Sequence, residues 1–119
     1  MLFTRKRTTQ LTPTEAKTRA EAGEIVMVDV RERDERSAAR PSESLHIPLG
    51  ELPARLGELP QPVAFICRSG SRSEMATRAA SERGLTAGNV RGGMLAWAEA
   101  GLPVEAGPEL DTTTATESR

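Results

Sequence analysis

The most constraining feature of this sequence is a short apolar run that leads directly into a polar, glycine-containing segment and then into a helix. Val63-Ala64-Phe65-Ile66 has the pattern of a buried strand, Cys67-Arg68-Ser69-Gly70-Ser71-Arg72-Ser73 follows it, and good helix formers extend from about Glu74 to Arg83. The turn that leaves the carboxyl end of a parallel strand is where sites form in open sheets. The first amides of the next helix lack internal partners and favour negative charge. The sequence therefore predicts a site built around Cys67.

Cys67 is the only cysteine of the chain, and its neighbours favour the ionised thiol. Cationic groups and a helix N-terminus lower the pKa of a cysteine. Arg68 and Arg72 supply positive charge. The other members of the segment are small enough for the backbone to curl into a nest of amides around the sulfur: Ser69, Gly70, Ser71 and Ser73. The alternative is a buried structural thiol, but six consecutive polar or glycine residues after Cys67 favour the functional interpretation.

Helix and strand patterns alternate along the rest of the chain. The expected elements are a short edge strand within 1–10, a helix over 13–22 capped by Thr12, a buried strand over 25–30, a polar irregular stretch over 31–44, a short helix over 49–56, a strand near 89–91 and a helix over 94–100. Such alternation indicates an α/β domain with a mainly parallel sheet. We expect residues 1–9 to form an N-terminal segment, 10–106 the domain, and the Thr-, Glu- and Ser-rich residues 107–119 a disordered tail.

Composition excludes several classes of site. One cysteine and one histidine allow neither an internal disulfide nor a zinc site of four cysteines, and we expect no metal and no cofactor. The 16 basic and 17 acidic residues give a net charge of -1, which offers no argument for nucleic-acid binding. No apolar run approaches the roughly 20 residues that a membrane helix requires. We therefore expect a soluble, monomeric protein of the cytoplasm, without nucleic-acid or membrane partners.

Three further blocks accompany the Cys67 segment in a definite order. They are VDVRERDE at 28–35, LHIPLGELPARL at 45–56 and VRGGMLAWAEAGLPV at 90–104. Together with CRSGSRS at 67–73, these blocks resemble the rhodanese-like family over roughly residues 10–105. The resemblance implies a three-layer α/β domain, with a mainly parallel central sheet flanked by helices. It also implies that Cys67 is a catalytic nucleophile that cycles through a persulfide.

One segment departs from the family pattern. Rhodanese-like domains usually carry a Gly-His-Ile-x-Gly-Ala segment soon after the block at 28–35. Here that place is taken by Ala39-Arg40-Pro41-Ser42-Glu43-Ser44. His46 belongs to the following block, so we do not identify it with the motif histidine. A thiolate held by amides and arginines needs no base, and His46 is not assigned a catalytic role.

Side chains at the end of the predicted strand 25–30 are expected to lie near the Cys67 site. Asp29 and Arg31 either shape the pocket or form an ion pair that braces the neighbouring loop, and we favour the brace for them and for Glu35. Trp97 is expected to anchor the last helix in the core. Gly92-Gly93 allow a turn or a close approach of two backbones.

The leading hypothesis is a sulfurtransferase that moves sulfane sulfur from a donor such as thiosulfate to a thiol, cyanide or a protein. In this mechanism Cys67 becomes a persulfide, a covalent intermediate. The segment from Arg68 to Ser73 would bind substrate. Its amides and Arg72 would stabilise the persulfide. We expect the amide of Arg72 to face the sulfur and its side chain to brace the loop. Arg68 would recruit an anionic donor.

Two other functions remain open at this stage. Relatives of the implied fold include phosphatases and arsenate reductases, whose loops carry C-x5-R. Cys67 and Arg72 have the shorter C-x4-R spacing, which suits a single sulfur atom better than a tetrahedral oxyanion. A non-catalytic binding module is disfavoured by the intact cysteine, whereas a slow persulfide carrier stays possible.

Overall fold

The computed structural model describes residues 7–109, and in this part of the chain a parallel sheet of five strands forms the centre. The strand order is β1-β6-β5-β2-β4, and every neighbouring pair is parallel. These strands are β1 (Thr9–Leu11), β2 (Val26–Asp29), β4 (Leu45–His46), β5 (Val63–Ile66) and β6 (Ala87–Val90). The predicted α/β class with a mainly parallel sheet is confirmed.

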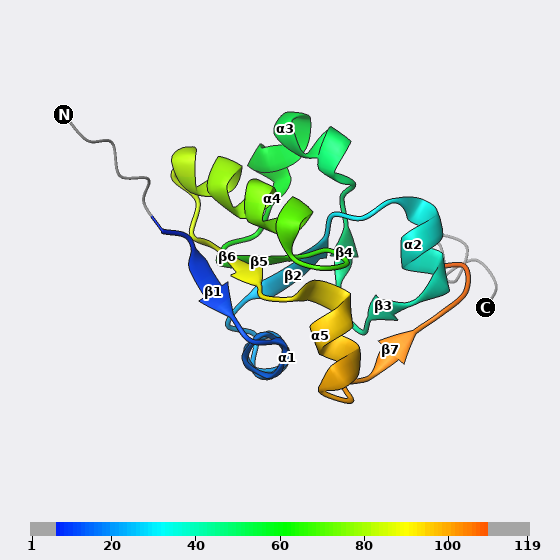
Figure 1. Cartoon of the computed structure of the whole chain (residues 1–119). Helices are drawn as coiled ribbons and strands as arrows, with labels where there is room; N and C mark the ends of the chain where they lie inside the picture. Colours follow the sequence, from blue (N-terminus) through cyan, green and yellow to red (C-terminus); the bar gives the residue numbers. More distant parts are fainter. Residues whose placement is uncertain (1–6, 110–119) are drawn as a thin grey trace, which may run out of the picture.

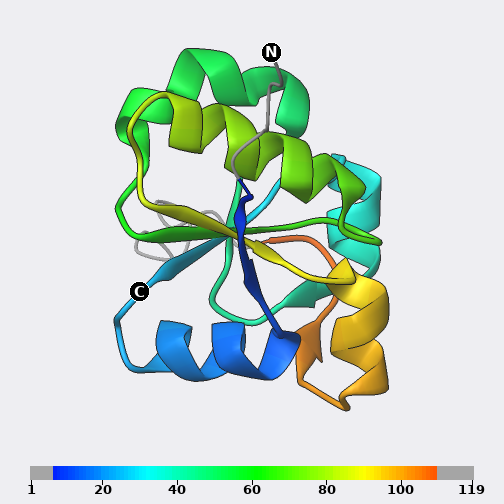
Figure 2. The same ribbon diagram turned by 60° about the vertical axis from the view of Figure 1, so that its left-hand side comes forward.

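Helices cover both faces of the sheet and give the molecule three layers. They are α1 (Pro13–Glu21), α2 (Arg33–Ala38), α3 (Leu52–Arg55), α4 (Ser71–Glu82) and α5 (Gly93–Glu99), with short 3-10 turns at Leu49–Glu51 and Leu56–Glu58. Figure 2 shows α3 and α4 on one side of the sheet and α1 and α5 on the other.

The central strand β5 is buried on both faces, which explains its continuous apolar sequence. Successive side chains of a strand point to opposite faces. Phe65 accordingly belongs to the core under α3 and α4, and Ile66 belongs to the core that α1 and α5 cover. In the second core Trp97 is 1% exposed and its indole N–H donates to the Pro103 carbonyl at 2.9 Å. The expectation that Trp97 anchors the last helix is confirmed.

Several predictions that rest on short sequence signals are confirmed by the structure. Thr12 caps α1 with the expected reciprocal pair: its hydroxyl accepts from the Glu15 N–H at 3.1 Å, and its own N–H donates to the Glu15 carboxylate at 2.8 Å. The expected edge strand is β1, which pairs with β6. The predicted short helix over 49–56 is α3 with its two flanking turns.

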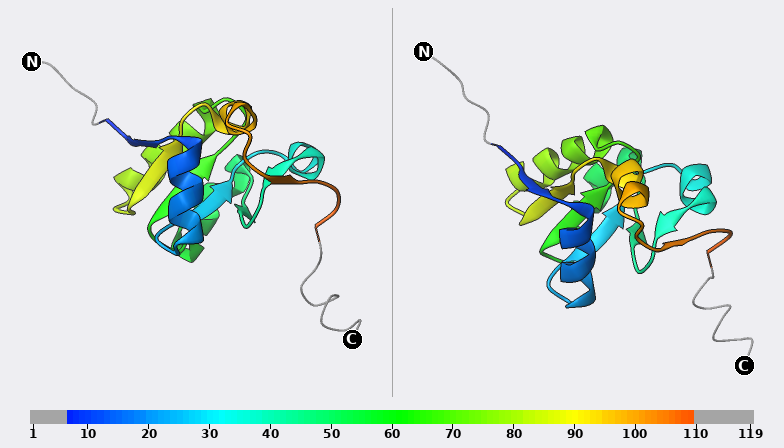
Figure 3. Two further views of the ribbon diagram at one scale, coloured as in Figure 1. Left: turned by 90° about the horizontal axis from the view of Figure 1, so that it is seen from below. Right: turned by 60° about the horizontal axis from the view of Figure 1, so that its bottom comes forward.

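Residues 31–44 were expected to be irregular, and this prediction is wrong. They contain α2 and the two-residue strand β3 (Arg40–Pro41), which pairs antiparallel with β7 (Val104–Glu105). The six-residue α2 is too short to show an apolar period, and it begins at a capping pair in which the Glu32 N–H donates to Glu35 at 3.0 Å. Figures 1 and 3 show α2, β3 and β7 together at one side of the central sheet.

Contacts of the chain continue past residue 106, the expected end of the domain. The Gly107 N–H donates to the Ser37 carbonyl at 2.7 Å, and Glu109 forms an ion pair with Arg36 at 2.6 Å. Residues 107–109 therefore dock on α2. The rest of the predicted tail lies outside the described residues. Within residues 7–109, no helix is long and apolar enough to cross a membrane.

Candidate active site

Cys67 lies where β5 ends, and its sulfur faces the first turn of α4. Gly70, in the left-handed conformation with φ 108°, turns the chain so that the helix begins at Ser71, three residues earlier than predicted. The Cys67 Sγ accepts hydrogen bonds from the Gly70 N–H at 3.1 Å and the Ser73 N–H at 3.3 Å. The Ser73 hydroxyl lies 3.2 Å from the same sulfur. The predicted nest of amides is therefore present around Cys67.

These contacts change the acidity of the thiol. Burial alone raises the pKa of Cys67, which is 1% exposed. Hydrogen bonds from the Ser73 hydroxyl and from the N–H groups of Ser73, Gly70 and Ser69 outweigh burial, so the pKa falls below its ordinary value. A buried, hydrogen-bonded sulfur of this kind is held as a thiolate more easily than a free cysteine.

The start of α5 locks the base of the Cys67 loop. The Met94 N–H donates to the Cys67 carbonyl at 2.8 Å, and the Leu95 N–H donates to the Arg68 carbonyl at 3.0 Å. A Cβ atom on Gly93 would lie 2.4 Å from the Cys67 carbonyl oxygen, so only glycine allows this approach. The close approach expected at Gly92-Gly93 is confirmed, and it rigidifies the backbone on which the nucleophile sits.

The two arginines of the loop have different surroundings. The Arg72 guanidinium donates to both oxygens of Glu35, at 2.7 and 2.8 Å, and this lowers the pKa of Glu35 to about 2 while raising that of Arg72. Arg72 thus joins α4 to α2. The exposed side chain of Arg68 makes no hydrogen bond or ion pair with any residue among 7–109. We expected the Arg72 amide to face the sulfur, but the amides that do so precede and follow it, at Gly70 and Ser73.

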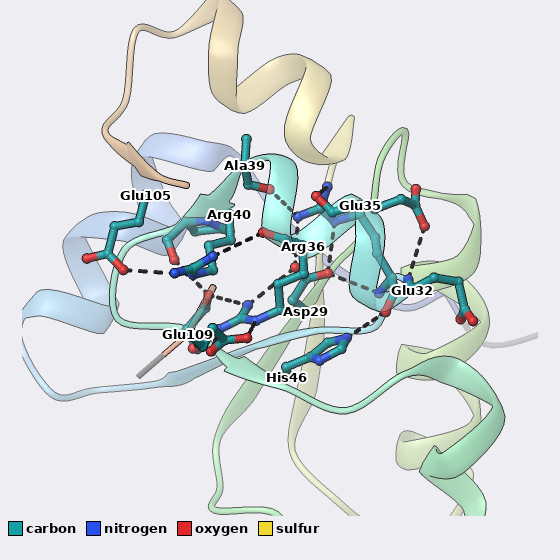
Figure 4. Close-up of polar contacts among 12 residues, drawn as sticks. Asp29, Glu32, Glu35, Arg36, Ala39, Arg40, His46, Glu105 and Glu109 are labelled. Carbon is teal, nitrogen blue, oxygen red and sulfur yellow. Dashed lines mark hydrogen bonds and ion pairs between the residues drawn. The ribbon is translucent and has the colours of Figure 1, made fainter. Parts of the chain in front are cut away.

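A buried ionic cluster supports α2 behind the site, as Figure 4 shows. Asp29 is fully buried and accepts from the Arg31 guanidinium at 3.0 and 2.8 Å and from Arg36 at 3.3 Å. Arg31 also donates to the Ala39 carbonyl at 2.6 Å. His46 donates from Nε2 to the Arg31 carbonyl at 2.7 Å. Asp29 and Arg31 form the brace that was favoured from the sequence, and His46 contacts this brace rather than Cys67.

The segment that departs from the family pattern is held by the same cluster. Arg40 is 6% exposed and donates to the carbonyls of Arg36, at 3.3 Å, and Gly107, at 2.7 Å. Its strand β3 pairs with β7, and Glu105 lies 3.9 Å from the Arg40 guanidinium. Arginines thus tie the C-terminal segment to α2 (Figure 4). The sequence analysis missed Glu105 and Gly107 as partners because both are far from Arg40 along the chain.

Only some of the predicted site residues contact the Cys67 sulfur. Gly70 and Ser73 touch the sulfur, and Arg72, Asp29 and Arg31 lie in the supporting ion pairs. The side chains of Ser69 and Ser71 are exposed and make no hydrogen bond with a described residue. Glu35 forms the bracing ion pair that was favoured for it, with Arg72 as a partner that the sequence did not name. Among residues 7–109, no group of three or more His, Cys, Asp or Glu side chains is placed to hold a metal ion.

Comparison with known proteins gives a consistent result. A sulfurtransferase of Allochromatium vinosum is 34% identical over 90 residues, which cover 73% of this chain and 84% of that protein. A rhodanese-related protein from Thermoplasma volcanium superposes with a TM-score of 0.75 and 30% identity, covering 82% of this chain and 97% of the other. Thiosulfate sulfurtransferase from Pseudomonas aeruginosa superposes with a TM-score of 0.76 and 25% identity, over 92% of this chain and 23% of that one.

The family model for the rhodanese-like domain matches residues 12–100. This range includes the Cys67 loop and the two helices that support it, α2 and α5. The parallel sheet, the helices on its two faces and the order of the sequence blocks agree with this match. The chain belongs to the rhodanese-like domain family.

Proposed function

We propose that this protein is a sulfurtransferase that carries sulfane sulfur as a persulfide on Cys67, with thiosulfate or a related anion as donor. The observation that carries the proposal is the hydrogen-bonded cradle around Sγ, in which Gly70 and Ser73 each aim an N–H at the sulfur. Donors fixed in this way favour an anionic sulfur without any rearrangement at the moment of reaction.

The reaction has two half-reactions. The Cys67 thiolate attacks the outer sulfur of thiosulfate, the sulfur–sulfur bond of the donor breaks, and sulfite leaves with the bonding pair. The resulting persulfide carries its charge on the outer sulfur. An acceptor such as a small thiol, cyanide or a protein thiol then attacks that sulfur, and Cys67 leaves again as the thiolate.

The other residues of the loop are given separate roles in this proposal. Ser73 contributes two donors to the sulfur, its N–H and its hydroxyl. Arg68 recruits the anionic donor, because its guanidinium is exposed and has no partner among residues 7–109. Arg72 keeps the loop in position through Glu35 and adds positive charge near the sulfur. Asp29 and Arg31 shape the wall of the pocket behind the Cys67 loop.

A phosphatase function is disfavoured by the same geometry. A phosphatase loop needs an arginine that is available to grip a tetrahedral oxyanion, and here the Arg72 guanidinium already binds both oxygens of Glu35. We therefore expect negligible turnover of an aryl phosphate such as 4-nitrophenyl phosphate. Turnover of that substrate faster than thiosulfate turnover would reverse the choice of function.

Intact-mass measurement tests the proposal directly. After incubation with thiosulfate and removal of the donor, the protein should gain the mass of one sulfur atom, and cyanide should then remove it as thiocyanate. Cys67→Ser should show neither change while its circular dichroism and melting temperature stay close to wild type. Loading of the Cys67→Ser protein, or a wild-type protein that gains no sulfur, would end the assignment.

A further inference from the structure

A cavity that shares no residue with the Cys67 loop lies between α1 and α5, on the face of the sheet that these two helices cover (Figure 2). The turn after β3 forms one of its sides, and its volume is about 220 Å³. A dry cavity of roughly 150 Å³ accommodates benzene. The cavity beside α1 therefore has room for a single ring with a short substituent. The sulfur chemistry proposed for Cys67 makes no use of it.

One part of the cavity lining is apolar. Met27 and Trp97 line it and are each 1% exposed, and Ala20 and Pro103 extend the same surface. The indole N–H of Trp97 donates to the Pro103 carbonyl at 2.9 Å, so this donor is already used. Methionine sulfur and the indole ring both pack well against an aromatic ring. The cavity therefore favours a ligand with a compact apolar body.

The polar part of the lining carries one unbalanced negative charge. Lys17 and Glu21 form an ion pair along α1, and their charges cancel. Ser42 and Glu43 also line the cavity, and neither side chain has a hydrogen bond or ion pair with a residue among 7–109. A carboxylate and a hydroxyl are thus present as acceptors without a donor. An ammonium group, with three N–H donors and one positive charge, complements them, and an indole ring also attracts a cation.

Glu43 occupies its place in the lining at a conformational cost. Its φ is 62°, and it is the only non-glycine residue among 7–109 with a positive φ. The left-handed region is unfavourable for a residue that carries a Cβ atom, and such strain collects at ligand sites. Glycine would satisfy this turn without strain but would supply no carboxylate. The strained backbone therefore indicates a role for the Glu43 side chain.

We propose that this cavity is a binding site for a small primary ammonium ion with a compact apolar body, of about the size of benzylamine. The ammonium group donates to Glu43 and Ser42, and the apolar body lies against Met27 and Trp97. The proposal is independent of the function proposed for Cys67, because none of the cavity's described residues contacts the Cys67 sulfur.

Trp97, the only tryptophan of the chain, reports binding in the cavity through its fluorescence. Because this side chain is 1% exposed, a solute in free solution barely quenches it. Benzylamine is titrated at about pH 7, where an alkylamine is protonated, beside benzyl alcohol, its neutral isostere. We expect a dissociation constant on the order of millimolar for benzylamine and about fivefold weaker binding of benzyl alcohol. Benzylamine should also raise the melting temperature, because it binds the folded protein.

Three variants locate the site and its charge. Glu43→Gln removes the carboxylate charge but keeps the backbone conformation, and it should weaken benzylamine binding about fivefold while leaving benzyl alcohol binding unchanged. Ala20→Leu fills the cavity and should weaken the binding of both ligands. Glu99→Gln is the matched control, because Glu99 is an exposed carboxylate on α5, the helix of Trp97, but lies outside the cavity. It should leave both dissociation constants unchanged.

Three results would contradict the proposal. Equal binding of benzylamine and benzyl alcohol to the wild type, or equal effects of Glu43→Gln and Glu99→Gln, would overturn the assignment of an ammonium ligand. Wild-type affinity in Ala20→Leu would show that the ligand binds elsewhere. A wild-type protein whose Trp97 fluorescence and melting temperature both ignore benzylamine would reject the site outright.

Discussion

Replacing Glu35 with glutamine removes one charge from the ion pair that joins α2 to the Cys67 loop. In the wild type both carboxylate oxygens accept from Arg72, at 2.7 and 2.8 Å, and one of them also accepts from the Glu32 N–H at 3.0 Å. Glutamine keeps an acceptor for the Glu32 N–H, so the cap of α2 survives. The substitution therefore isolates the ionic contact with Arg72.

The size of the effect follows from the pKa of Glu35. Arg72 is the main cause that lowers this pKa from 4.5 to about 2. At 1.36 kcal/mol per pKa unit, the shift corresponds to roughly 3 kcal/mol as an upper bound. The side chains of Arg72 and Glu35 are 33% and 26% exposed, and solvent screening reduces the contribution. We expect Glu35→Gln to lower the free energy of unfolding by about 1–2 kcal/mol at pH 7.

The pH dependence gives the sharper test. Because the folded-state pKa of Glu35 is depressed, its contribution is complete above the unfolded-state pKa and is lost as the pH falls from about 4.5 towards 2. Urea unfolding followed by the fluorescence of Trp97, the single and buried tryptophan, measures the difference between wild type and variant. Glu58→Gln, which breaks an exposed pair with Arg55, is the control. The reasoning fails if the two variants lose the same stability, or if the Glu35→Gln difference persists unchanged at low pH.

Three further predictions concern the Cys67 loop. Ser73→Ala removes the hydroxyl 3.2 Å from Sγ and should raise the Cys67 pKa, because that hydroxyl helps to lower it. The measurement is the pH midpoint of alkylation by iodoacetamide, and an unmoved midpoint contradicts the prediction. Gly93→Ala places a Cβ 2.4 Å from the Cys67 carbonyl oxygen and should lower the free energy of unfolding in urea by about 2–4 kcal/mol. An unfolding curve identical to that of the wild type would exclude the close approach. Arg68→Ala should raise the KM for thiosulfate about tenfold without changing kcat, and a change in kcat alone would assign Arg68 to the transition state instead.

The features that could be predicted from the sequence are those with local signals. The buried run before Cys67, the cap at Thr12 and the glycines at 92–93 each describe their own surroundings, and the structure places them as expected. The cradle of Cys67 belongs to this group, because its donors lie within six residues of the sulfur. After β5, the left-handed Gly70 and the start of α4 turn these amides towards the sulfur.

The contacts that the sequence did not predict join residues that are far apart along the chain. Glu35 and Arg72 are 37 residues apart, and Arg36 and Glu109 are 73 apart. No period or spacing reports such pairs, so residues 31–44 were expected to be irregular. Arg72 was expected to turn its amide to the sulfur and to brace the loop with its side chain, but the sequence did not name Glu35 as the partner of that brace. Arg68, by contrast, was expected to recruit an anionic donor, and its exposed side chain has no hydrogen-bond or ion-pair partner among residues 7–109.

The segment that departs from the family pattern leads to a last prediction. Glu43 occupies the fifth of the six places where rhodanese-like domains usually carry Gly-His-Ile-x-Gly-Ala, and its φ is 62°, in the left-handed region. A non-glycine residue there costs about 1–2 kcal/mol, whereas glycine adds roughly 0.5–1 kcal/mol of entropy loss on folding. Glu43→Gly should therefore stabilise the protein by about 0.5–1 kcal/mol in urea unfolding.

Two controls separate this backbone effect from the loss of a charge. Glu43→Gln keeps the left-handed strain and should leave the unfolding free energy nearly unchanged. Ser42→Gly, at the preceding position of the same turn, removes no such strain because only Glu43 among the described non-glycine residues has a positive φ, and it should destabilise slightly. If Glu43→Gln stabilised the protein as much as Glu43→Gly, the gain would come from the removed charge. The turn after β3 would then not be strained at the position where the family carries glycine.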